Sequence, residues 1–475
     1  MSEIRTRFAP SPTGALHAGT VRTALFAWLV AKHNDGKFIL RIEDTDQARS
    51  VEGGVNNIIE SLHYVGIEWD AGPDKPADYG PFIQSERLDS YKVYANKLIN
   101  AGLAYADPYS IEELQELRDK AKSEHKPFLY RNHRPENPLV WDGSQPLRLR
   151  SDPKVYKWKD AVMGDMSASA EAIDDFIIIK SDGFPTYNFA HIIDDLAMSI
   201  THVIRSQEFI SSMPRFLNLY EALGIEYPIF ATLPPVLNET GKRKLSKREG
   251  AKQILEYKQM GIMPEALINF LALLGWNDGT TQEIFTTQEI IDKFELSRVQ
   301  KSGAQFNENH LIYTNGVFIR NLELEELYKR VANFWPSAAK SYEEDYKKKV
   351  LNLVQERLKY FAELSDLTIF FFEDLPVNLG LIENNKQLSK FTHDDLKELL
   401  VKAKVSLEEN DFSLESLTSS LNKLLEETNQ KPAVLFSLIR VATTQAPASP
   451  GLAESLGVLG KDRSLARLDV MINSL

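Results

Sequence analysis

The start of the chain constrains its fold most, because strand and helix patterns alternate there twice. Residues 4–9 alternate between polar and apolar side chains, a turn-rich stretch follows, and apolar residues then recur at helical spacing up to Gly36. Residues 38–42 form a second apolar strand pattern, and residues 55–65 form a second helix pattern that Gly66 closes. This order predicts an α/β domain with a parallel, doubly wound sheet.

The same rhythm stops and later resumes. Residues 107–170 are rich in Pro, Asn and Arg and contain a helix pattern over 111–122, so we expect them to be inserted into the sheet domain. Strand patterns over 176–180 and 201–205 then continue the sheet, and the helix pattern after them stops at Gly224. Further helix patterns cover 254–260, 264–274, 288–294, 325–334, 346–364, 393–404, 414–427 and 432–442, followed by a last pair. The predicted fold class is α/β, a Rossmann-type doubly wound parallel sheet with an inserted domain, followed by an all-α C-terminal region.

Composition and charge exclude several kinds of protein. The chain has 475 residues and no cysteine, which excludes disulfides, thiolate zinc sites and a cysteine nucleophile. The sequence contains no stretch of about 18 or more apolar residues, which a membrane span would need, and no signal-peptide core near its start. We therefore expect a cytoplasmic protein. The histidines show no metal-binding spacing, so any metal should arrive with a nucleotide.

The net charge of −12 has the wrong sign for binding nucleic acid by bulk attraction. Such binding would need local basic patches. The candidates are the stretch from Arg131 to Arg134, the pair Arg148 and Arg150, and the run at 242–248. Each patch taken separately could also be a solvated charged loop.

The loop between the first strand and the first helix has the features of an anion site. A helix start offers free N–H groups and the positive end of the helix dipole. Gly14 and Gly19 let a nucleotide approach the backbone closely, and His17 can donate a hydrogen bond to a phosphate oxygen. A connecting loop with a capping histidine would contain the same residues, so this motif is weak by itself.

A second candidate anion site lies far along the chain, at residues 242–248. Five of these seven residues are Lys or Arg, and such a density of positive charge repels itself unless an anion binds. A lysine can follow a phosphate as its geometry changes, and Arg248 can form paired hydrogen bonds. On one α/β domain, the two motifs together predict attack of a carboxylate on the α-phosphate of ATP, because nucleotidyl transfer needs mainly positioning and charge stabilisation.

Four further residues lie in or just after predicted strands: Arg7, Glu43, Tyr187 and Arg205. The carboxyl ends of parallel strands meet at one edge of a sheet, so we expect these side chains to cluster there. Together they suit an acidic amino acid, with a carboxylate on Arg7 and Tyr187 and an ammonium on Glu43. For each residue singly, a structural salt bridge beneath the sheet edge is an equally good interpretation.

With these motifs in place, the chain resembles a class I aminoacyl-tRNA synthetase, and within that class a bacterial-type glutamyl-tRNA synthetase, over nearly its whole length. The matching motifs are RFAPSPTG at 7–14, HAGT at 17–20, RIEDTD at 41–46, SDGFPTY at 181–187, VIRSQE at 203–208 and KLSKR at 244–248. The resemblance implies that glutamate and ATP form glutamyl-adenylate and pyrophosphate, after which the 3′ end of tRNA(Glu) accepts the glutamyl group. Mg²⁺ would accompany ATP.

The resemblance also assigns site residues. Glutamate would be bound by Arg7, Ala9, Ser11, Glu43, Tyr187 and Arg205. ATP would be bound by His17, Gly19, Glu208, Lys244, Lys247 and Arg248. Within the second set, His17, Lys244 and Lys247 would be catalytic, with Lys247 stabilising the transition state. Two positions depart from many relatives, namely Thr20 in place of a second histidine and His191 in place of an asparagine.

The resemblance implies a domain order as well. Residues 1–106 and 171–250 would be the two halves of the catalytic domain, 107–170 an acceptor-stem-binding insertion, 251–321 a helical stem-contact domain, and 322–475 an anticodon-binding region. Arg131, Arg134 and Arg357 would contact tRNA, with Arg357 on the helix predicted over 346–364. Some relatives hold zinc in the insertion with cysteines, but residues 105–109 contain none, so we expect no zinc. We also expect a monomer.

Several alternatives remain at this point. A glutaminyl enzyme shares the chemistry, but its first signature has Glu and Asn where this chain has Ser11 and Thr13, and its tRNA-reading part is a β-barrel. A catalytically silent paralogue would be free to lose His17, Glu43 and Lys244, and an adenylating enzyme without tRNA would leave the helical tail unused. A non-discriminating enzyme that also charges tRNA(Gln) stays open, because it depends on anticodon contacts whose register is not fixed.

Overall fold

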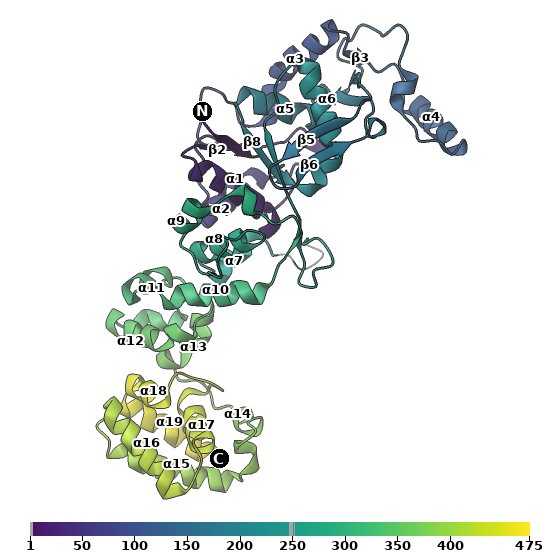
Figure 1. The fold of residues 1–475 in the computed structure, drawn as a ribbon. Coiled ribbons are helices and arrows are strands. Elements are labelled where there is room, and N and C mark those ends of the chain that lie inside the picture. Colours follow the sequence, from purple (N-terminus) through teal and green to yellow (C-terminus); the bar gives the residue numbers. More distant parts are fainter. Residues whose placement is uncertain (1–2, 247–249, 251) are drawn as a thin grey trace. The chain divides into compact units, whose positions relative to one another are not determined.

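The computed structural model describes residues 3–246, 250 and 252–475, which form two compact units (Figure 1). Unit 1 comprises Met1–Lys258 and Pro264–Leu311, and unit 2 comprises Gln259–Met263 and Ile312–Leu475. Within the described ranges, no helix is long and apolar enough to cross a membrane.

Unit 1 begins with the predicted strand–helix repeat. Strand β1 (Arg5–Phe8) pairs in parallel with β2 (Lys37–Leu40), and helix α1 (Ala18–His33) connects them. Helix α2 (Gly54–Val65) ends at Gly66, whose φ of 82° lies in the left-handed region that favours glycine. The order and approximate bounds expected from the sequence are confirmed.

The second part of the parallel sheet is built around β8 (His202–Ser206) and β9 (Ile229–Leu233), which pair in parallel. Strand β5 (Tyr156–Asp160) pairs in parallel with β9 and antiparallel with β6 (Gly164–Ala168), giving the order β6–β5–β9–β8. The predicted parallel α/β sheet is thus present, with one antiparallel edge strand.

Strand β8 runs beside β1, which brings the two halves of the domain together. The backbone N–H of Thr201 donates to the carbonyl of Arg5 at 2.9 Å, and the Arg7 guanidinium donates to the carbonyl of Ile204 at 3.4 Å. The carboxyl ends of β1, β2 and β8 therefore lie near one another, as the fold requires for a ligand site.

The strand predicted over 176–180 exists, but its place in the parallel sheet was predicted wrongly. Strand β7 (Phe176–Ile179) pairs antiparallel with β4 (Leu147–Leu149), which pairs antiparallel with β3 (Ala104–Ala106). A short apolar run indicates a buried strand but carries no information about its partner. Pairing also runs across the boundaries predicted at 106/107 and 170/171, so the finer domain division stays a prediction.

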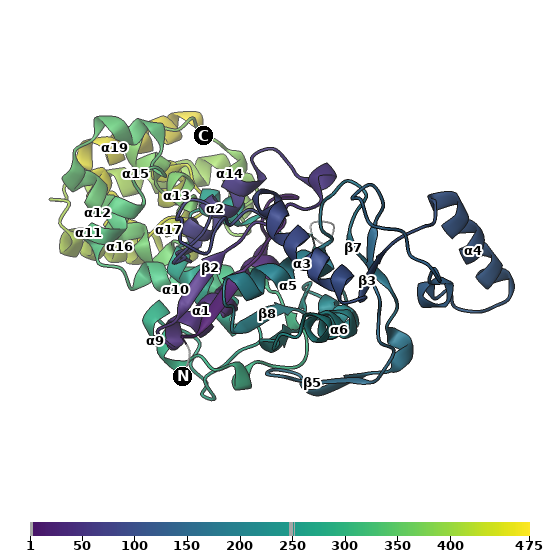
Figure 2. The same ribbon diagram turned by 90° about the horizontal axis from the view of Figure 1, so that it is seen from above.

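The insertion also contains the predicted helix. Helix α4 (Ile111–Ser123) starts with a capping box, in which Ser110 and Glu113 bond each other's backbone N–H groups. In both ribbon views α4 projects away from the strands of unit 1 (Figures 1 and 2).

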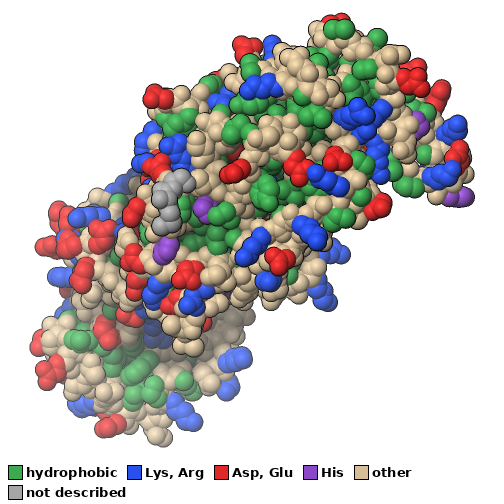
Figure 3. All heavy atoms as spheres, turned by 45° about the horizontal axis from the view of Figure 1, so that its top comes forward, with side chains coloured by type: hydrophobic (Ala, Val, Ile, Leu, Met, Phe, Trp, Pro, Cys, Tyr) green, Lys and Arg blue, Asp and Glu red, His purple; other side chains and the backbone are tan. Residues whose placement is uncertain are grey.

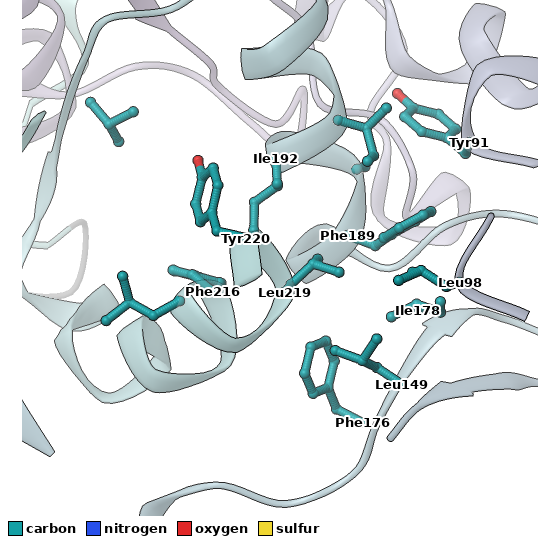
Figure 4. Close-up of a cluster of buried hydrophobic side chains, with 14 of the residues drawn as sticks. Tyr91, Leu98, Leu149, Phe176, Ile178, Phe189, Ile192, Phe216, Leu219 and Tyr220 are labelled. Carbon is teal, nitrogen blue, oxygen red and sulfur yellow. The ribbon is translucent and has the colours of Figure 1, made fainter. Parts of the chain in front are cut away.

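A large buried core packs α3 (Leu88–Asn100), α5 (Tyr187–Ala197) and α6 (Met213–Leu223) against β4 and β7 (Figure 4). Its members include Tyr91, Leu98, Leu149, Phe176, Ile178, Phe189, Ile192, Phe216, Leu219 and Tyr220. Each such side chain contributes about 1.5–3 kcal/mol when fully buried. This core holds α5 and β8 in place, and both carry residues predicted for the site.

The rest of unit 1 is mainly helical. A short parallel pair joins β10 (Val236–Leu237) to β11 (Ala304–Gln305). The helices that follow the sheet are α7 (Ile254–Met260), α8 (Pro264–Leu273), α9 (Thr287–Lys293) and α10 (Glu308–Arg320). The first three match the predicted segments, whereas α10 was not predicted, and most of it, from Ile312 onward, belongs to unit 2.

Unit 2 has only helices among its described elements, in agreement with the predicted all-α region. They are α11 (Leu324–Arg330), α12 (Glu344–Val354), α13 (Glu363–Phe372), α14 (Gly380–Glu383), α15 (His393–Glu408), α16 (Leu414–Thr428), α17 (Pro432–Thr444), α18 (Leu452–Leu459) and α19 (Lys461–Ser474).

The single helix predicted over 346–364 was wrong. The chain leaves the α-helix after Val354, makes one short 3₁₀ turn at Gln355–Arg357, and starts α13 only at Glu363. Tertiary hydrogen bonds replace helical ones there, because the Phe361 N–H donates to the carbonyl of Gly261 at 3.2 Å. Arg357 therefore lies on the turn and not within a long helix.

Candidate active site

A cavity of about 740 Å³ opens in unit 1 where β1, β2 and β8 end. It brings together residues that the sequence placed in two separate sets. The predicted residues that line it are Arg7, Ala9, Ser11, His17, Gly19, Glu43, Tyr187, Arg205, Glu208 and Lys244. The expected clustering at the carboxyl edge of the sheet is confirmed, and the cavity has the size and position of a ligand site.

A buried ion network forms one wall of this cavity. Arg7 holds Asp195 with two bonds, from Nε at 3.0 Å and from Nη2 at 3.3 Å. Arg41 donates to Asp195 at 2.8 Å and to Glu43 at 3.0 Å. Burial raises the pKa of Asp195, but the charges of Arg7 and Arg41 outweigh it and hold that pKa well below its usual range. The Asp195 carboxylate is therefore ionised and fixes the orientation of Arg7.

Glu43 is the second carboxylate of the network. It is buried, and burial raises its pKa although the charge of Arg41 acts in the opposite direction. A carboxylate in this state favours a further positive partner. An ammonium group in the cavity would supply it.

Arg205 differs from the other buried arginines. It is 5% exposed, and its Nε, Nη1 and Nη2 atoms have no hydrogen-bond partner among the residues that the structure describes. The guanidinium instead lies 5.5 Å from the ring of Phe209 and 5.0 Å from that of Phe216, and burial lowers its pKa. An unpaired guanidinium at a cavity wall is suited to bind a carboxylate, because its desolvation is otherwise uncompensated.

Tyr187 completes this end of the cavity. Its ring stacks on His191 with centroids 4.7 Å apart, and His191 Nδ1 donates to the carbonyl of Tyr187 at 2.7 Å. Burial lowers the pKa of His191, so that the ring is neutral with its proton on Nδ1. Burial also raises the pKa of Tyr187 to about 12, which keeps the phenol protonated and able to donate to a carboxylate.

The other end of the cavity carries the two candidate phosphate motifs. His17 is the N-cap of α1, and its Nε2 lies 3.2 Å from Thr20 Oγ1. Lys244 Nζ donates to Glu208 at 2.8 Å, and this bond lowers the pKa of Glu208. A helix start and an ammonium therefore face the same space, as an anion site requires. A Cβ on Gly19 would lie 3.4 Å from the His17 ring, which is ordinary van der Waals contact.

Two predicted ATP residues, Lys247 and Arg248, lie outside the described residues. Their roles stay predictions.

The residues predicted to contact tRNA lie elsewhere. The Arg134 guanidinium donates two hydrogen bonds to the Asp175 carboxylate, from Nε at 2.8 Å and from Nη2 at 2.7 Å. The Arg131 guanidinium donates to the carbonyl of Ile173. Arg357 is exposed in unit 2. Their proposed contact with tRNA is still a prediction.

The prediction of a basic patch at Arg148 and Arg150 was wrong for Arg148. Arg148 is buried, with Nε bonded to Asp107 at 2.6 Å and its guanidinium over the Tyr130 ring at 3.6 Å. All three residues of β4 are buried, and Asp107 pairs with the charge of Arg148, so this arginine does not offer its charge to a partner. On the face drawn in Figure 3, Lys and Arg side chains lie in small groups next to Asp and Glu.

The sequence reasoning missed the partners that hold the site together. Asp194 and Asp195 lie on buried turns of α5, where Asp194 accepts from Arg87 at 2.6 Å and Asp195 from Arg7 and Arg41. The available signal was two adjacent acids within an otherwise apolar helix pattern, since acids rarely occupy buried positions without partners. Within the described ranges, no group of three or more His, Asp or Glu side chains could hold a metal ion.

Comparison with known proteins agrees with the fold. Residues 3–312 match the family described as "tRNA synthetases class I (E and Q), catalytic domain", and residues 326–472 match "Anticodon binding domain". These matches define a class I aminoacyl-tRNA synthetase. A protein named glutamate–tRNA ligase from Dehalococcoides mccartyi is 40% identical over 100% of this chain and 98% of its own length. A protein of the same name from Exiguobacterium sibiricum is also 40% identical, over 99% of this chain and 100% of its own length. The chain belongs to the glutamate–tRNA ligase family.

A solved structure supports the same conclusion. The crystal structure of a glutamate tRNA ligase from Elizabethkingia meningosepticum in complex with its amino acid superposes with a TM-score of 0.88 at 30% identity, over 100% of both chains. The resemblance inferred from the motifs is confirmed, and the glutaminyl alternative is not favoured. The family uses ATP.

Proposed function

We propose that this protein attaches L-glutamate to the 3′ end of tRNA(Glu), using ATP, in two steps through glutamyl-adenylate. The observation that carries the proposal is the cavity itself. One end has an unpaired guanidinium, Arg205, close to the ion network of Glu43, and the other has the start of α1 and Lys244. These ends suit an acidic amino acid and a nucleoside triphosphate.

The balance of buried charge favours glutamate over glutamine. The buried charged groups at this end are four guanidiniums (Arg7, Arg41, Arg87, Arg205) and three carboxylates (Glu43, Asp194, Asp195), which leaves 4 − 3 = +1. Glutamate has two carboxylates and one ammonium, so it brings −1 and neutralises the site. Glutamine brings no net charge and would leave one positive charge of the site uncompensated, which is costly in a desolvated cavity.

In the first step, the α-carboxylate of glutamate attacks the α-phosphorus of ATP. A bond forms from the carboxylate oxygen to that phosphorus, and the bond to the bridging oxygen breaks to release pyrophosphate. His17, Lys244 and Lys247 stabilise the negative charge that develops on the phosphates, and Glu208 orients Lys244. Gly19 and Arg248 complete the ATP site, and Mg²⁺ accompanies ATP as the counter-ion of its phosphates.

In the second step, a hydroxyl of the terminal ribose of tRNA attacks the carbonyl carbon of the adenylate, and AMP leaves. Arg7, Ala9, Ser11, Glu43, Tyr187 and Arg205 hold the glutamyl group through both steps. Residues 107–170 bind the acceptor stem with Arg131 and Arg134, and 251–321 contact the stem. Residues 322–475 bind the anticodon, with Arg357 as one contact. The protein acts as a monomer.

Two assays test the proposal. Purified protein should catalyse glutamate-dependent exchange of pyrophosphate into ATP, measured with and without tRNA, and should charge purified tRNA(Glu). Absence of exchange under both conditions would rule out the proposed enzymatic activity. Charging of tRNA(Gln) measured side by side decides whether the enzyme is non-discriminating.

Replacing Lys247 with Ala is expected to raise the barrier to adenylate formation by about 3 kcal/mol, the loss typical of one preorganised charge or donor. The fold should be unaffected, because the proposed role of the Lys247 ammonium is to bind phosphate. Single-turnover formation of adenylate measures the effect. Unchanged turnover would remove Lys247 from the mechanism.

Replacing Glu43 with Gln is expected to weaken glutamate binding and to change its pH dependence. Only the ionised form of Glu43 pairs with the ammonium, and its raised pKa means that protonation begins at a higher pH than for an ordinary glutamate. As pH is lowered, the KM for glutamate should therefore begin to rise in the parent enzyme at a higher pH than the pKa of an ordinary glutamate would give, and it should rise less in E43Q. Identical pH profiles would show that Glu43 does not titrate against the substrate.

A further inference from the structure

Arg22 is a buried cation at the nucleotide end of the cavity that has no role in the steps above. It follows His17 by five positions on α1, lines the cavity, and is 2% exposed. Burial lowers its pKa to about 10, so it is still protonated at neutral pH. No carboxylate within the described residues forms an ion pair with it. A cation buried in this way is costly, so an apolar side chain of similar size would be expected unless the guanidinium has a task.

The surroundings of Arg22 fix its guanidinium closely. Nη1 donates to the carbonyl of Pro234 at 2.9 Å, and the guanidinium lies 5.0 Å from the Phe26 ring. A Cβ added to Gly275 would come within 3.1 Å of Nη2, at a backbone φ of +98°, so glycine is suited there on both grounds. Within the part of the chain that the structure describes, Nε and Nη2 have no hydrogen-bond partner.

The hydrogen bond from Arg22 to the Pro234 carbonyl connects the helix that carries His17 to the segment that pairs with Lys244. Pro234 lies two residues before Val236, the first residue of strand β10, and the Val236 carbonyl accepts a hydrogen bond from the N–H of Leu245 at 2.8 Å. Leu237 of the same strand forms an antiparallel bridge with Lys244. The pairing of β10 with β11 holds this segment from one side, and Arg22 holds it from α1, so the position of the Lys244 backbone relative to α1 depends in part on Arg22.

We propose that Arg22 is a positioning residue for ATP: by binding the Pro234 carbonyl beneath the cavity, it fixes β10 and Lys244 at the distance from His17 that a bound nucleotide requires. This proposal rests on the proposed function, because ATP is the ligand that spans the two motifs. Arg22 acts through the backbone of its neighbours and not through the reacting atoms.

Equilibrium binding of ATP with Mg²⁺, measured by calorimetry on the full chain without glutamate or tRNA, tests the proposal. In R22M the Kd for ATP should rise by about tenfold, the factor for one lost hydrogen bond of a charged donor. The Kd for glutamate should stay unchanged. R22K, which keeps a charged donor, should regain part of the ATP affinity. Arg5→Met is the matched control, because Arg5 is a partly exposed arginine on β1 that does not line the cavity.

The outcomes distinguish the role of Arg22 from the proposed function. Parent protein that binds no ATP would contradict the proposed function. Parent protein that binds ATP, with R22M binding it equally well, would overturn the role of Arg22. Equal loss of ATP and glutamate affinity together with a lower Tm would also overturn it, because Arg22 would then only support the fold. R22K that folds but binds ATP no better than R22M would exclude the hydrogen bond to Pro234 as the cause.

Discussion

Replacing Arg205 with Met is expected to raise the KM for glutamate by roughly 150-fold, equivalent to about 3 kcal/mol, the usual loss when one partner of a buried charged hydrogen bond is removed. The reason is that Arg205 is the buried guanidinium with no hydrogen-bond partner among the described residues, so it has the largest gain from a substrate carboxylate. The KM for ATP should stay constant, because Arg205 lies at the amino acid end. Pyrophosphate exchange at varied glutamate and ATP measures both constants.

A second measurement on the same variant distinguishes binding from folding. Without substrate, R205M should have a Tm no lower than the parent protein, because the substitution removes an uncompensated buried charge. Arg215→Met provides the control, since Arg215 is a partly buried arginine on α6 that does not line the cavity. An unchanged KM for glutamate in R205M would mean that the substrate carboxylates bind elsewhere, with Arg7 as the next candidate.

The parts of the fold that follow from local pattern could be predicted. The strand, loop and helix around His17 depend on residues close in sequence, and so do the helix ends at Gly66 and Gly224, both of which adopt the left-handed conformation that glycine allows. The clustering of Arg7 and Tyr187 followed from one topological rule, that parallel strands end at a common edge.

The partners of charged groups could not be predicted in the same way. Arg7 and Asp195 are 188 positions apart, and the sequence does not say that Arg7 is already neutralised while Arg205 is not. The same limit applies to Arg134, whose ion pair with Asp175 the sequence does not indicate, and to β7, whose partner strand is antiparallel. Residue type indicates what a side chain can bind, but long-range packing decides whether it is available.

This distinction changes which arginine is central to the substrate. The residue pattern predicts a substrate carboxylate on Arg7 and Tyr187. The geometry makes Arg7 a partner of Asp195 first, so that any bond from Arg7 to substrate shares a guanidinium that is already fixed. Fixed orientation lowers the cost of binding, because little side-chain freedom is left to lose. Arg205 then supplies the uncompensated charge, and Arg7 supplies a preorganised donor.

Replacing Asp195 with Asn is expected to destabilise the protein by about 3–5 kcal/mol, because it leaves Arg7 and Arg41 buried without their shared carboxylate. The pKa of Asp195 is depressed in the folded protein, so its contribution is present above the unfolded value of about 4 and is lost as pH falls through the folded value. The difference in unfolding free energy between parent and D195N should therefore be constant from about pH 7 to about pH 5 and should shrink only below about pH 4.

Denaturant unfolding at several pH values measures this difference, with Asp70→Asn as the control. Asp70 pairs with Lys32 and Lys37 at 3.4 Å each near the surface, so its loss should cost about 1 kcal/mol or less. Folded D195N that survives should also bind glutamate more weakly, since Arg7 loses its fixed orientation. A D195N protein as stable as the parent would show that Arg7 and Arg41 find other acceptors, and the ion network would then be unnecessary for the shape of the site.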